Sequence, residues 1–215
     1  MQEIRLEQVL PQFFEKGKTA PSDIWLQDIS FRKGLNIQVV APSGSGKTSL
    51  VHFLYRMRSD YTGKIFFDTK DSSSLDPDAL ARLRTNELSV VFQDLRLFPA
   101  QSMRENIRVK RDLAPFIGAA SMEEMAAMLG IAHKLEQSAG TCSYGEQQRI
   151  AIIRALQQPF DFLLLDEPFS HLDDNNIEKA MKLILNESAK RKACVLLADL
   201  QVNNSFPADQ TLKLA

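Results

Sequence analysis

The ten residues APSGSGKTSL, from Ala41 to Leu50, constrain the fold of this chain more than any other stretch. They follow the apolar run LNIQVV and match the phosphate-binding pattern G-x-x-x-x-G-K-[ST] at Gly46, Lys47 and Thr48. Ala41 replaces the first glycine of the pattern. Because Ala41 precedes a proline, its backbone favours an extended conformation, which alanine adopts without strain. The sequence therefore predicts a strand, a glycine-rich loop and a helix that together hold a phosphate.

Short apolar runs elsewhere in the chain indicate a sheet. The runs NIQVV, KIFF, LSVVF, FLLLD and CVLLAD alternate with helical stretches such as KTSLVHFLYRMR, a pattern typical of buried parallel strands in an α/β fold. Residues 99–158 are instead rich in helix-forming segments such as SMEEMAAMLGI. We expect a single domain over residues 1–215, in which 1–98 and 159–215 form the α/β core and 99–158 form an inserted helical subdomain.

Composition argues against several classes of function. The 215 residues include 26 basic and 27 acidic side chains without a basic block, so nucleic-acid binding is not expected. No apolar run approaches the roughly 18–20 residues that span a bilayer, and the N-terminus lacks the apolar stretch of a signal peptide. Cys142 and Cys194 have no metal-ligand spacing, so we expect two small buried side chains in a reducing compartment.

The glycine-rich loop carries the residues expected to bind a nucleotide. Its backbone N–H groups can surround a phosphate at the positive end of the helix that follows. Lys47 is expected to reach the β- and γ-phosphates, and the Thr48 hydroxyl is expected to be a ligand of Mg²⁺. The nucleotide-binding residues predicted here are Ser43, Gly44, Ser45, Gly46, Lys47, Thr48 and Ser49.

A pair of acidic residues follows the apolar run FLLLD. Asp166 ends this run, and ligands of open α/β sheets bind at the carboxyl ends of the strands. Asp166 is placed to orient Mg²⁺, and Glu167 is placed to act as a general base on an attacking water. An acidic pair after a strand is more often a solvated turn, but the phosphate loop upstream favours the catalytic interpretation.

The segment CSYGEQQR, residues 142–149, resembles the L-S-G-G-Q signature of the ATP-binding cassette (ABC) ATPases. Ser143 and Gly145 are retained and Glu146 stands at the glutamine position, whereas Cys142 and Tyr144 depart from the pattern. Taken alone, a serine and a glycine before a helix also describe an ordinary N-cap. The identification therefore depends on the other motifs.

Order and spacing extend the resemblance over nearly the whole chain. The run VVFQD places Gln93 at the Q-loop glutamine of that family, and SHLD places Asp173 at the D-loop aspartate. The resemblance implies an α/β P-loop NTPase core of ABC type that binds ATP, with Mg²⁺ held by Thr48, Gln93 and Asp166. It implies catalytic roles for Glu167, Gln93 and Lys47. It also implies an ATP molecule sandwiched between two cassettes, with contacts from Ser143, Gly145, Glu146 and Asp173.

The resemblance implies two kinds of partner. One is a second ABC subunit that joins on ATP binding, in the simplest case an identical copy, and the other is a separate transmembrane permease. Residues 74–107 look like the Q-loop region of the lipoprotein-releasing, macrolide-exporting and cell-division group of bacterial cassettes. Amino-acid importers share much of this sequence. The cargo and the direction of transport therefore stay open. We expect a cytoplasmic protein, held at the inner face of the cell membrane by its permease.

One departure from the family leaves the rate of hydrolysis open. Aligning CVLLADLQ with the last core strand of the family puts Leu200 at the switch histidine, and leucine cannot contact the γ-phosphate. We expect Glu167 to sustain slower hydrolysis, and the alternative is a hydrolysis-poor ATP-dependent clamp or regulator outside transport. His171 is expected to be an interface or cap residue rather than a substitute. A nucleoside-kinase-like phosphotransferase would leave CSYGEQQR and SHLD unexplained.

The residue that stacks on the adenine is the least constrained part of the predicted site. Family cassettes stack the base on an aromatic side chain after the first strand, which points to Phe13. Phe14 and Trp25 are the alternatives. All three aromatic side chains also suit simple packing against the sheet, because aromatic residues are usually buried.

Overall fold

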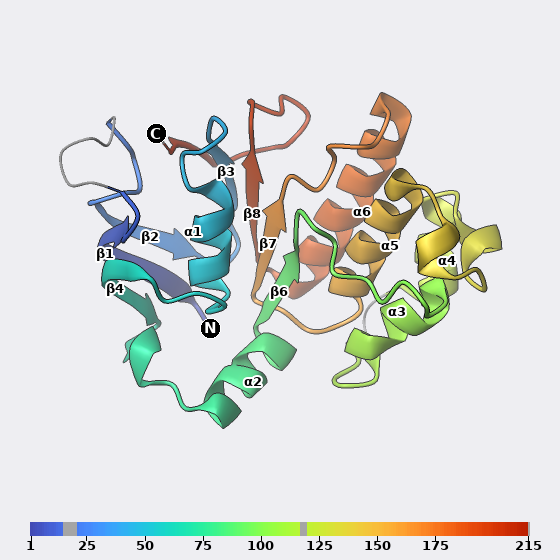
Figure 1. The fold of residues 1–215 in the computed structure, drawn as a ribbon, viewed down its shortest axis with the longest axis horizontal. Coiled ribbons are helices and arrows are strands. Elements are labelled where there is room, and N and C mark those ends of the chain that lie inside the picture. The colour runs from blue at the N-terminus through green and yellow to red at the C-terminus, as the bar shows by residue number, and fades with distance from the viewer. Residues whose placement is uncertain (15–20, 117–119, 215) are drawn as a thin grey trace.

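The computed structural model describes residues 1–14, 21–116 and 120–214, which form two sheets with helices around them (Figure 1). The antiparallel sheet has the strand order β2-β1-β4-β5, with bounds β1 (Glu3–Pro11), β2 (Asp28–Arg32), β4 (Tyr61–Phe67) and β5 (Lys70–Asp71). The parallel sheet has the order β6-β7-β8-β3-β9, with bounds β3 (Asn36–Val40), β6 (Leu88–Val91), β7 (Phe162–Asp166), β8 (Cys194–Asp199) and β9 (Gln210–Lys213).

Strands β6, β7, β8 and β3 of the parallel sheet are buried on both faces, as the apolar runs predict, whereas the edge strand β9 is mostly exposed. Along β7, Leu163 and Leu165 pack into one apolar cluster with α5 and α6, whereas Phe162 and Leu164 pack into a second cluster with α1. The helices have the bounds α1 (Lys47–Leu54), α2 (Pro77–Asn86), α3 (Met103–Arg111), α4 (Met122–Met128), α5 (Tyr144–Leu156) and α6 (Asp174–Arg191), with short 3₁₀ turns η1 (Ser72–Ser74), η2 (Ala132–Lys134) and η3 (Ala139–Thr141). Strands covered on both faces read as continuous apolar sequence, which explains the run FLLLD.

Two details differ from the sequence prediction. The run KIFF lies in β4, which pairs antiparallel with β1 rather than parallel with the other runs. In β4, Ile65 is buried while Lys64 is exposed, as expected for a sheet with one face in water. The helix predicted over KTSLVHFLYRMR ends at Leu54, because Arg56 adopts the left-handed backbone conformation at φ 58°.

The stretch from residue 99 to 158 contains α3, α4 and α5, which lie together on one side of the parallel sheet (Figure 1). Met103, Met125 and Ile150 are fully buried in the cluster between them. Cys142 and Cys194 are free and buried, as predicted. Among the described residues, no helix is both long and apolar enough to cross a membrane.

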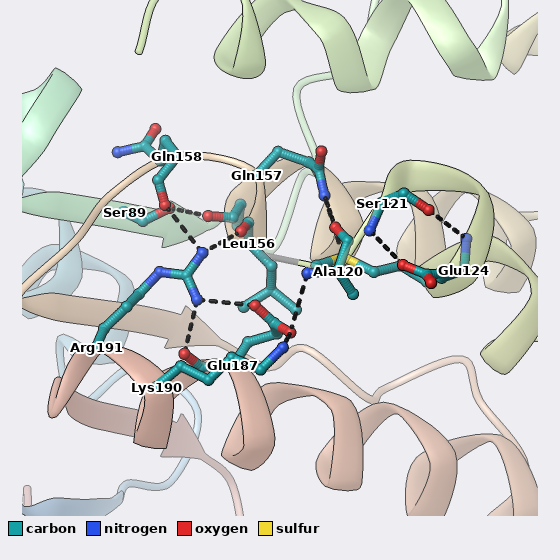
Figure 2. A network of polar contacts seen from close by, with 12 residues as sticks. Ser89, Ala120, Ser121, Glu124, Leu156, Gln157, Gln158, Glu187, Lys190 and Arg191 are labelled. Carbon is teal, nitrogen blue, oxygen red and sulfur yellow. Dashed lines mark hydrogen bonds and ion pairs between the residues drawn. The ribbon is translucent and has the colours of Figure 1, made fainter. Parts of the chain in front are cut away.

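A buried ion pair joins the last helix to the helical region (Figure 2). Arg191 Nη1 lies 2.9 Å from Glu187 Oε2, and both side chains are 2% exposed. Arg191 Nη2 donates to the main-chain oxygen of Leu156 at 2.7 Å, at the end of α5. Glu187 Oε1 accepts from the main-chain N–H of Ala120 at 3.4 Å. The pair therefore connects α6 both to α5 and to the segment that enters α4.

We expect Glu187→Ala to lower the free energy of unfolding by about 3–5 kcal/mol, because it leaves the Arg191 charge buried without its carboxylate. Urea denaturation at neutral pH measures the change. The control is Glu178→Ala on the exposed side of the same helix, for which we expect a change within about 0.5 kcal/mol. A loss below about 1 kcal/mol for Glu187→Ala would show that the ion pair contributes little.

Candidate functional site

The phosphate loop joins β3 to α1 at the carboxyl end of the parallel sheet. Gly44 and Gly46 have φ values of 85° and 89°, the left-handed region that favours glycine. A Cβ atom on Gly46 would also lie 3.1 Å from the Trp25 ring and 3.2 Å from the Phe14 ring. The backbone conformation therefore favours glycine at position 46, and a side chain there would also be in tight contact with two aromatic rings.

Ala41 occupies a position that does not need glycine. It is not among the residues with positive φ, and its N–H donates to the main-chain oxygen of Asp199 at 3.0 Å. Ala41 thus continues the pairing of β3 with β8 for one more residue before the loop begins. The replacement of the first glycine leaves the loop conformation intact, as predicted.

Trp25 contacts both the phosphate loop and the helix that follows it. The indole Nε1 donates to the main-chain oxygen of Ser45 at 3.0 Å, and the ring packs edge-on against Phe53 of α1 at a centroid distance of 6.3 Å. Trp25 is only 2% exposed. A ring buried in this way cannot stack on a base, so the alternative in which Trp25 holds the adenine is wrong.

A pocket of about 290 Å³ opens in front of the loop. Its lining consists of Phe13, Pro42, Ser43, Gly44, Gly46, Lys47, Thr48, Ser49, Gln93 and Glu167. Of the loop residues predicted to bind nucleotide, only Ser45 is outside the lining, because its hydroxyl turns inward and donates to the main-chain oxygen of Pro42 at 2.8 Å. Within the pocket, Lys47 Nζ lies 2.6 Å from Glu167 Oε1.

Phe13 is the aromatic residue best placed to meet a base. It lines the pocket and is 53% exposed. Phe14 lies behind it with ring centroids 4.8 Å apart, and Phe14 also lies against the position of Gly46. The Arg58 guanidinium lies over the Phe13 ring at 5.6 Å. Adenine stacking on Phe13 stays a prediction that this exposure favours.

Three oxygen-bearing side chains predicted for Mg²⁺ come together beside Lys47. The Thr48 hydroxyl donates to Gln93 Oε1 at 3.2 Å. Asp166 is fully buried, and neither carboxylate oxygen has a hydrogen-bond partner among the described residues. Burial raises the pKa of Asp166 to about 6, and the nearby Thr48 hydroxyl and Lys47 ammonium oppose this only in part.

These three side chains fit a divalent cation. A buried carboxylate without donors is unfavourable, and a bound cation would relieve it. Hydroxyl, amide and carboxylate oxygens are the ligands that Mg²⁺ prefers, usually one or two carboxylates completed by substrate phosphates and water. Within the described ranges, no group of three or more His, Cys, Asp or Glu residues that could hold a metal ion is found.

Glu167 has a strained backbone. Its φ is 46°, in the left-handed region that costs a non-glycine residue about 1–2 kcal/mol. Its N–H donates to the main-chain oxygen of Ala198 at 2.9 Å, so β7 stays paired with β8 up to this residue. The chain then turns, and the Glu167 side chain meets Lys47. The role of Glu167 as general base stays a prediction.

Leu200, at the predicted switch position, lies outside this pocket. It is 45% exposed and lines a separate depression together with Asp174, Glu178 and residues 199–205. The phosphate pocket, as lined by described residues, contains no histidine. Glu167 is the residue with a carboxylate among those that line this pocket.

The signature residues lie at the N-terminus of α5 and do not line the phosphate pocket of their own chain. Ser143 Oγ accepts from the N–H of Glu146 at 3.3 Å, while Glu146 Oε2 accepts from the N–H of Ser143 at 2.8 Å. Asp173 caps α6 in a similar way by accepting from the N–H of Asn176 at 2.8 Å. Ser143, Gly145, Glu146 and Asp173 are thus helix-capping or first-turn residues of α5 and α6 that are not among those lining the phosphate pocket.

The charge of Glu146, where the family signature has glutamine, is balanced locally. Lys134 Nζ lies 3.3 Å from Glu146 Oε1. The hydrogen bond from the Ser143 N–H, together with Lys134, lowers the pKa of Glu146. Ser143 uses its hydroxyl oxygen only as an acceptor here, so its O–H proton stays available to donate. An anion facing this helix N-terminus would meet donors rather than an uncompensated carboxylate.

Comparison with known proteins agrees with these motifs. A protein-family model described as "ABC transporter" matches residues 26–170. The macrolide export ATP-binding/permease protein MacB of Marinobacter nauticus is 30% identical over 88% of this chain, and the chain spans only 30% of that protein. The lipoprotein-releasing system ATP-binding protein LolD of Idiomarina loihiensis is 31% identical over 87% of this chain and 86% of its own length.

Solved structures share the fold. The dimeric post-hydrolysis state of the ATP-binding cassette MJ0796, bound to ADP and Pi, has a TM-score of 0.82 over 98% of this chain and 94% of that one, at 24% identity. A further dimeric structure of MJ0796 has a TM-score of 0.79 at 25% identity.

We expect Asp166→Asn to stabilise the protein when nucleotide and Mg²⁺ are absent. A shift of the Asp166 pKa from 3.8 to about 6 corresponds to an ionisation penalty of about 3 kcal/mol above pH 7. The new amide also lacks partners, so we expect a net gain of about 1–2 kcal/mol. Because the folded-state pKa is raised, the penalty develops as pH rises from about 4 through 6, and the gain should shrink toward pH 4.

Urea denaturation in EDTA at pH 8 and pH 5 measures this gain. With ATP and Mg²⁺ present, we expect the parent to be stabilised and the Asp166→Asn protein to lose that stabilisation. A variant that is less stable than the parent at pH 8 in EDTA would contradict an unfavourable buried carboxylate.

Proposed function

The chain belongs to the ABC transporter family, and on that premise we propose that it binds and hydrolyses ATP to power a separate membrane permease through ATP-driven dimerisation. One observation carries the proposal. The phosphate-loop lysine Lys47 and the strand-end carboxylate Glu167 meet at 2.6 Å in one pocket, beside the buried Asp166. The residues proposed to bind phosphate, to act as base and to hold the cation thus lie at the carboxyl ends of β3 and β7, two parallel strands on either side of β8.

ATP binding requires Lys47 to exchange partners. In this structure its ammonium group is paired with Glu167 Oε1, whereas the β- and γ-phosphates would offer several anionic oxygens at the same point. Moving Lys47 onto the phosphates frees the Glu167 carboxylate to accept a proton. Lys47 therefore leaves Glu167 only when the triphosphate binds. The Glu167 carboxylate is then unpaired only while nucleotide is in the pocket.

The hydrolytic step follows from the residues present. Glu167 accepts a proton from a water molecule as the water oxygen attacks the γ-phosphorus, and the bond from that phosphorus to the bridging oxygen of ADP breaks. Thr48, Gln93 and Asp166 would hold the Mg²⁺, which neutralises charge on the β- and γ-phosphate oxygens. Ser143 and the N-terminus of α5 from a second copy would donate to the γ-phosphate.

The placement of the signature supports a role for a second copy. Ser143 and Gly145 do not line the phosphate pocket of their own chain, yet they start a helix of 13 residues whose first turn can hold an anion. We propose that two chains pair with the loop of each facing the signature of the other. ATP then lies in the interface and favours the dimer, and its hydrolysis removes that linkage.

A permease is the partner that would turn this cycle into transport. We propose that the chain works at the inner face of the membrane, attached to a permease, with the cargo left open. Co-purification with a membrane protein that stimulates the ATPase would support this proposal. A hydrolysis-poor clamp is the second candidate, favoured by the position of Leu200 outside the phosphate pocket.

We expect Glu167→Gln to lower the steady-state ATPase rate by about 100-fold or more, because the amide keeps the shape of the side chain but cannot accept the proton. ATP binding should persist, and light scattering should detect an ATP-bound dimer. The matched control is Glu178→Gln, an exposed glutamate of α6 that should keep the parent rate. Retention of more than a tenth of the rate would exclude Glu167 as the base.

We expect Leu200→His to increase the ATPase rate by about 10-fold or more if the switch position limits turnover, since one well-placed donor is worth about that much or more. Phosphate release from the parent and from this variant distinguishes the two candidates. A parent protein that dimerises on ATP but releases no phosphate would favour the clamp. Transfer of phosphate to an added nucleoside would contradict both candidates.

A further inference from the structure

Tyr144 stands where the family signature has its first glycine, and its side chain contacts two other motifs of the same chain. The phenol Oη donates to the main-chain oxygen of Gln93 at 2.8 Å. The Tyr144 ring lies against the His171 ring with centroids 4.2 Å apart. Glycine at this position would make neither contact. Tyr144 therefore adds a connection between the signature, the Q-loop and the D-loop.

We propose that Tyr144 is a positioning residue that fixes the Q-loop ligand Gln93 for Mg²⁺ and holds the signature helix in register with it. This inference rests on the proposed function. Gln93 is bound at two points, since its Oε1 accepts from the Thr48 hydroxyl at 3.2 Å and its main-chain oxygen accepts from Tyr144. Two hydrogen bonds in series thus run from the phosphate loop through Gln93 to the first turn of α5.

The anchor on the main chain determines how Gln93 responds to a cation. To hold Mg²⁺, Gln93 Oε1 would have to turn from its bond with Thr48 toward the cation. With its main-chain oxygen held by Tyr144, only side-chain rotation is needed and the Q-loop backbone keeps its place. Fixing a ligand before binding reduces the conformational entropy lost on binding and so raises affinity.

The D-loop backbone at His171 packs closely against the first turn of α5. A Cβ atom on Gly145 would lie 2.8 Å from the main-chain oxygen of His171, so the first turn of α5 packs directly against this backbone. The N–H of His171 donates to Gln148 Oε1 at 3.2 Å, and His171 Nδ1 lies 2.9 Å from Ser170 Oγ. The His171 backbone is thus held against α5, and its ring contacts the phenol ring of Tyr144.

Tyr144 also borders the space next to the candidate cation ligands. A pocket of about 300 Å³ is lined by Thr48, His52, Gln93, Asp94 and Tyr144. The side chain is 40% exposed, so its removal opens no large cavity in the core. Loss of the phenol hydroxyl should therefore change cation binding far more than folding.

The test compares Tyr144→Phe with the parent in titrations of Mg²⁺ at a fixed concentration of the non-hydrolysable analogue AMP-PNP. Calorimetry follows binding, and so does the fluorescence of Trp25, the only tryptophan, whose indole contacts the phosphate loop. The phenylalanine keeps the ring on His171 and removes only the hydrogen bond to Gln93. We expect the half-saturating Mg²⁺ concentration to rise about 3- to 10-fold, the range for one lost hydrogen bond.

Two further measurements separate positioning from general destabilisation. The affinity for AMP-PNP in EDTA and the melting temperature should match those of the parent. Tyr61→Phe is the matched control, because its phenol contacts Arg56 and Ser72 and Tyr61 does not line the phosphate pocket. That variant should leave the Mg²⁺ dependence unchanged. Tyr144→Gly, which restores the family residue, should shift it at least as far as Tyr144→Phe.

A shift of less than 2-fold in Tyr144→Phe would overturn the positioning role, as would an equal loss of AMP-PNP affinity in EDTA. Faster ATP turnover in Tyr144→Phe at an unchanged Mg²⁺ dependence would overturn it too, since the contact would then be a brake in the nucleotide-free state. A parent protein that binds neither AMP-PNP nor Mg²⁺·AMP-PNP would overturn the proposed function together with this inference.

Discussion

The parallel pairing of β7, β8 and β3 is the constraint on which the candidate site depends. β8 lies between the other two strands, so the loop after β3 and the acidic pair after β7 leave the sheet at the same edge. Two further hydrogen bonds, from Ala41 to Asp199 and from Glu167 to Ala198, extend this pairing into the site. The contact between Lys47 and Glu167 is a consequence of this register.

The site is assembled at a cost in stability. Asp166 is a buried carboxylate with an elevated pKa and without donors in the described structure, and Glu167 has a left-handed backbone. Neither feature favours folding of the nucleotide-free chain. The apolar clusters on the two faces of the parallel sheet stabilise the fold and so offset the cost of the buried Asp166 carboxylate and the strained Glu167 backbone. A ligand that binds here would offset the unfavourable burial of Asp166 and the backbone strain of Glu167.

Local sequence patterns predicted the core parallel strands and the conformation of the phosphate loop. The runs NIQVV, FLLLD and CVLLAD are β3, β7 and β8, and the glycines of the phosphate loop have the expected backbone conformation. The antiparallel pairing of KIFF was not predicted, because an apolar run of four residues does not specify its partner strand. The roles of Trp25 and Tyr144 depend on contacts with Ser45 and Gln93, which are distant in sequence. For Tyr144 the available signal was that a large aromatic residue replaces a glycine of the signature, and for Trp25 it was only that an aromatic residue follows the first strand.

A crystal structure of the chain with AMP-PNP and Mg²⁺ would show whether Lys47 exchanges Glu167 for phosphate. We expect Lys47 Nζ on the β- and γ-phosphates, a cation among Thr48, Gln93 and Asp166, and Ser143 of a second copy facing the γ-phosphate. Nucleotide bound with Lys47 still paired to Glu167, or bound away from the phosphate loop, would contradict this account.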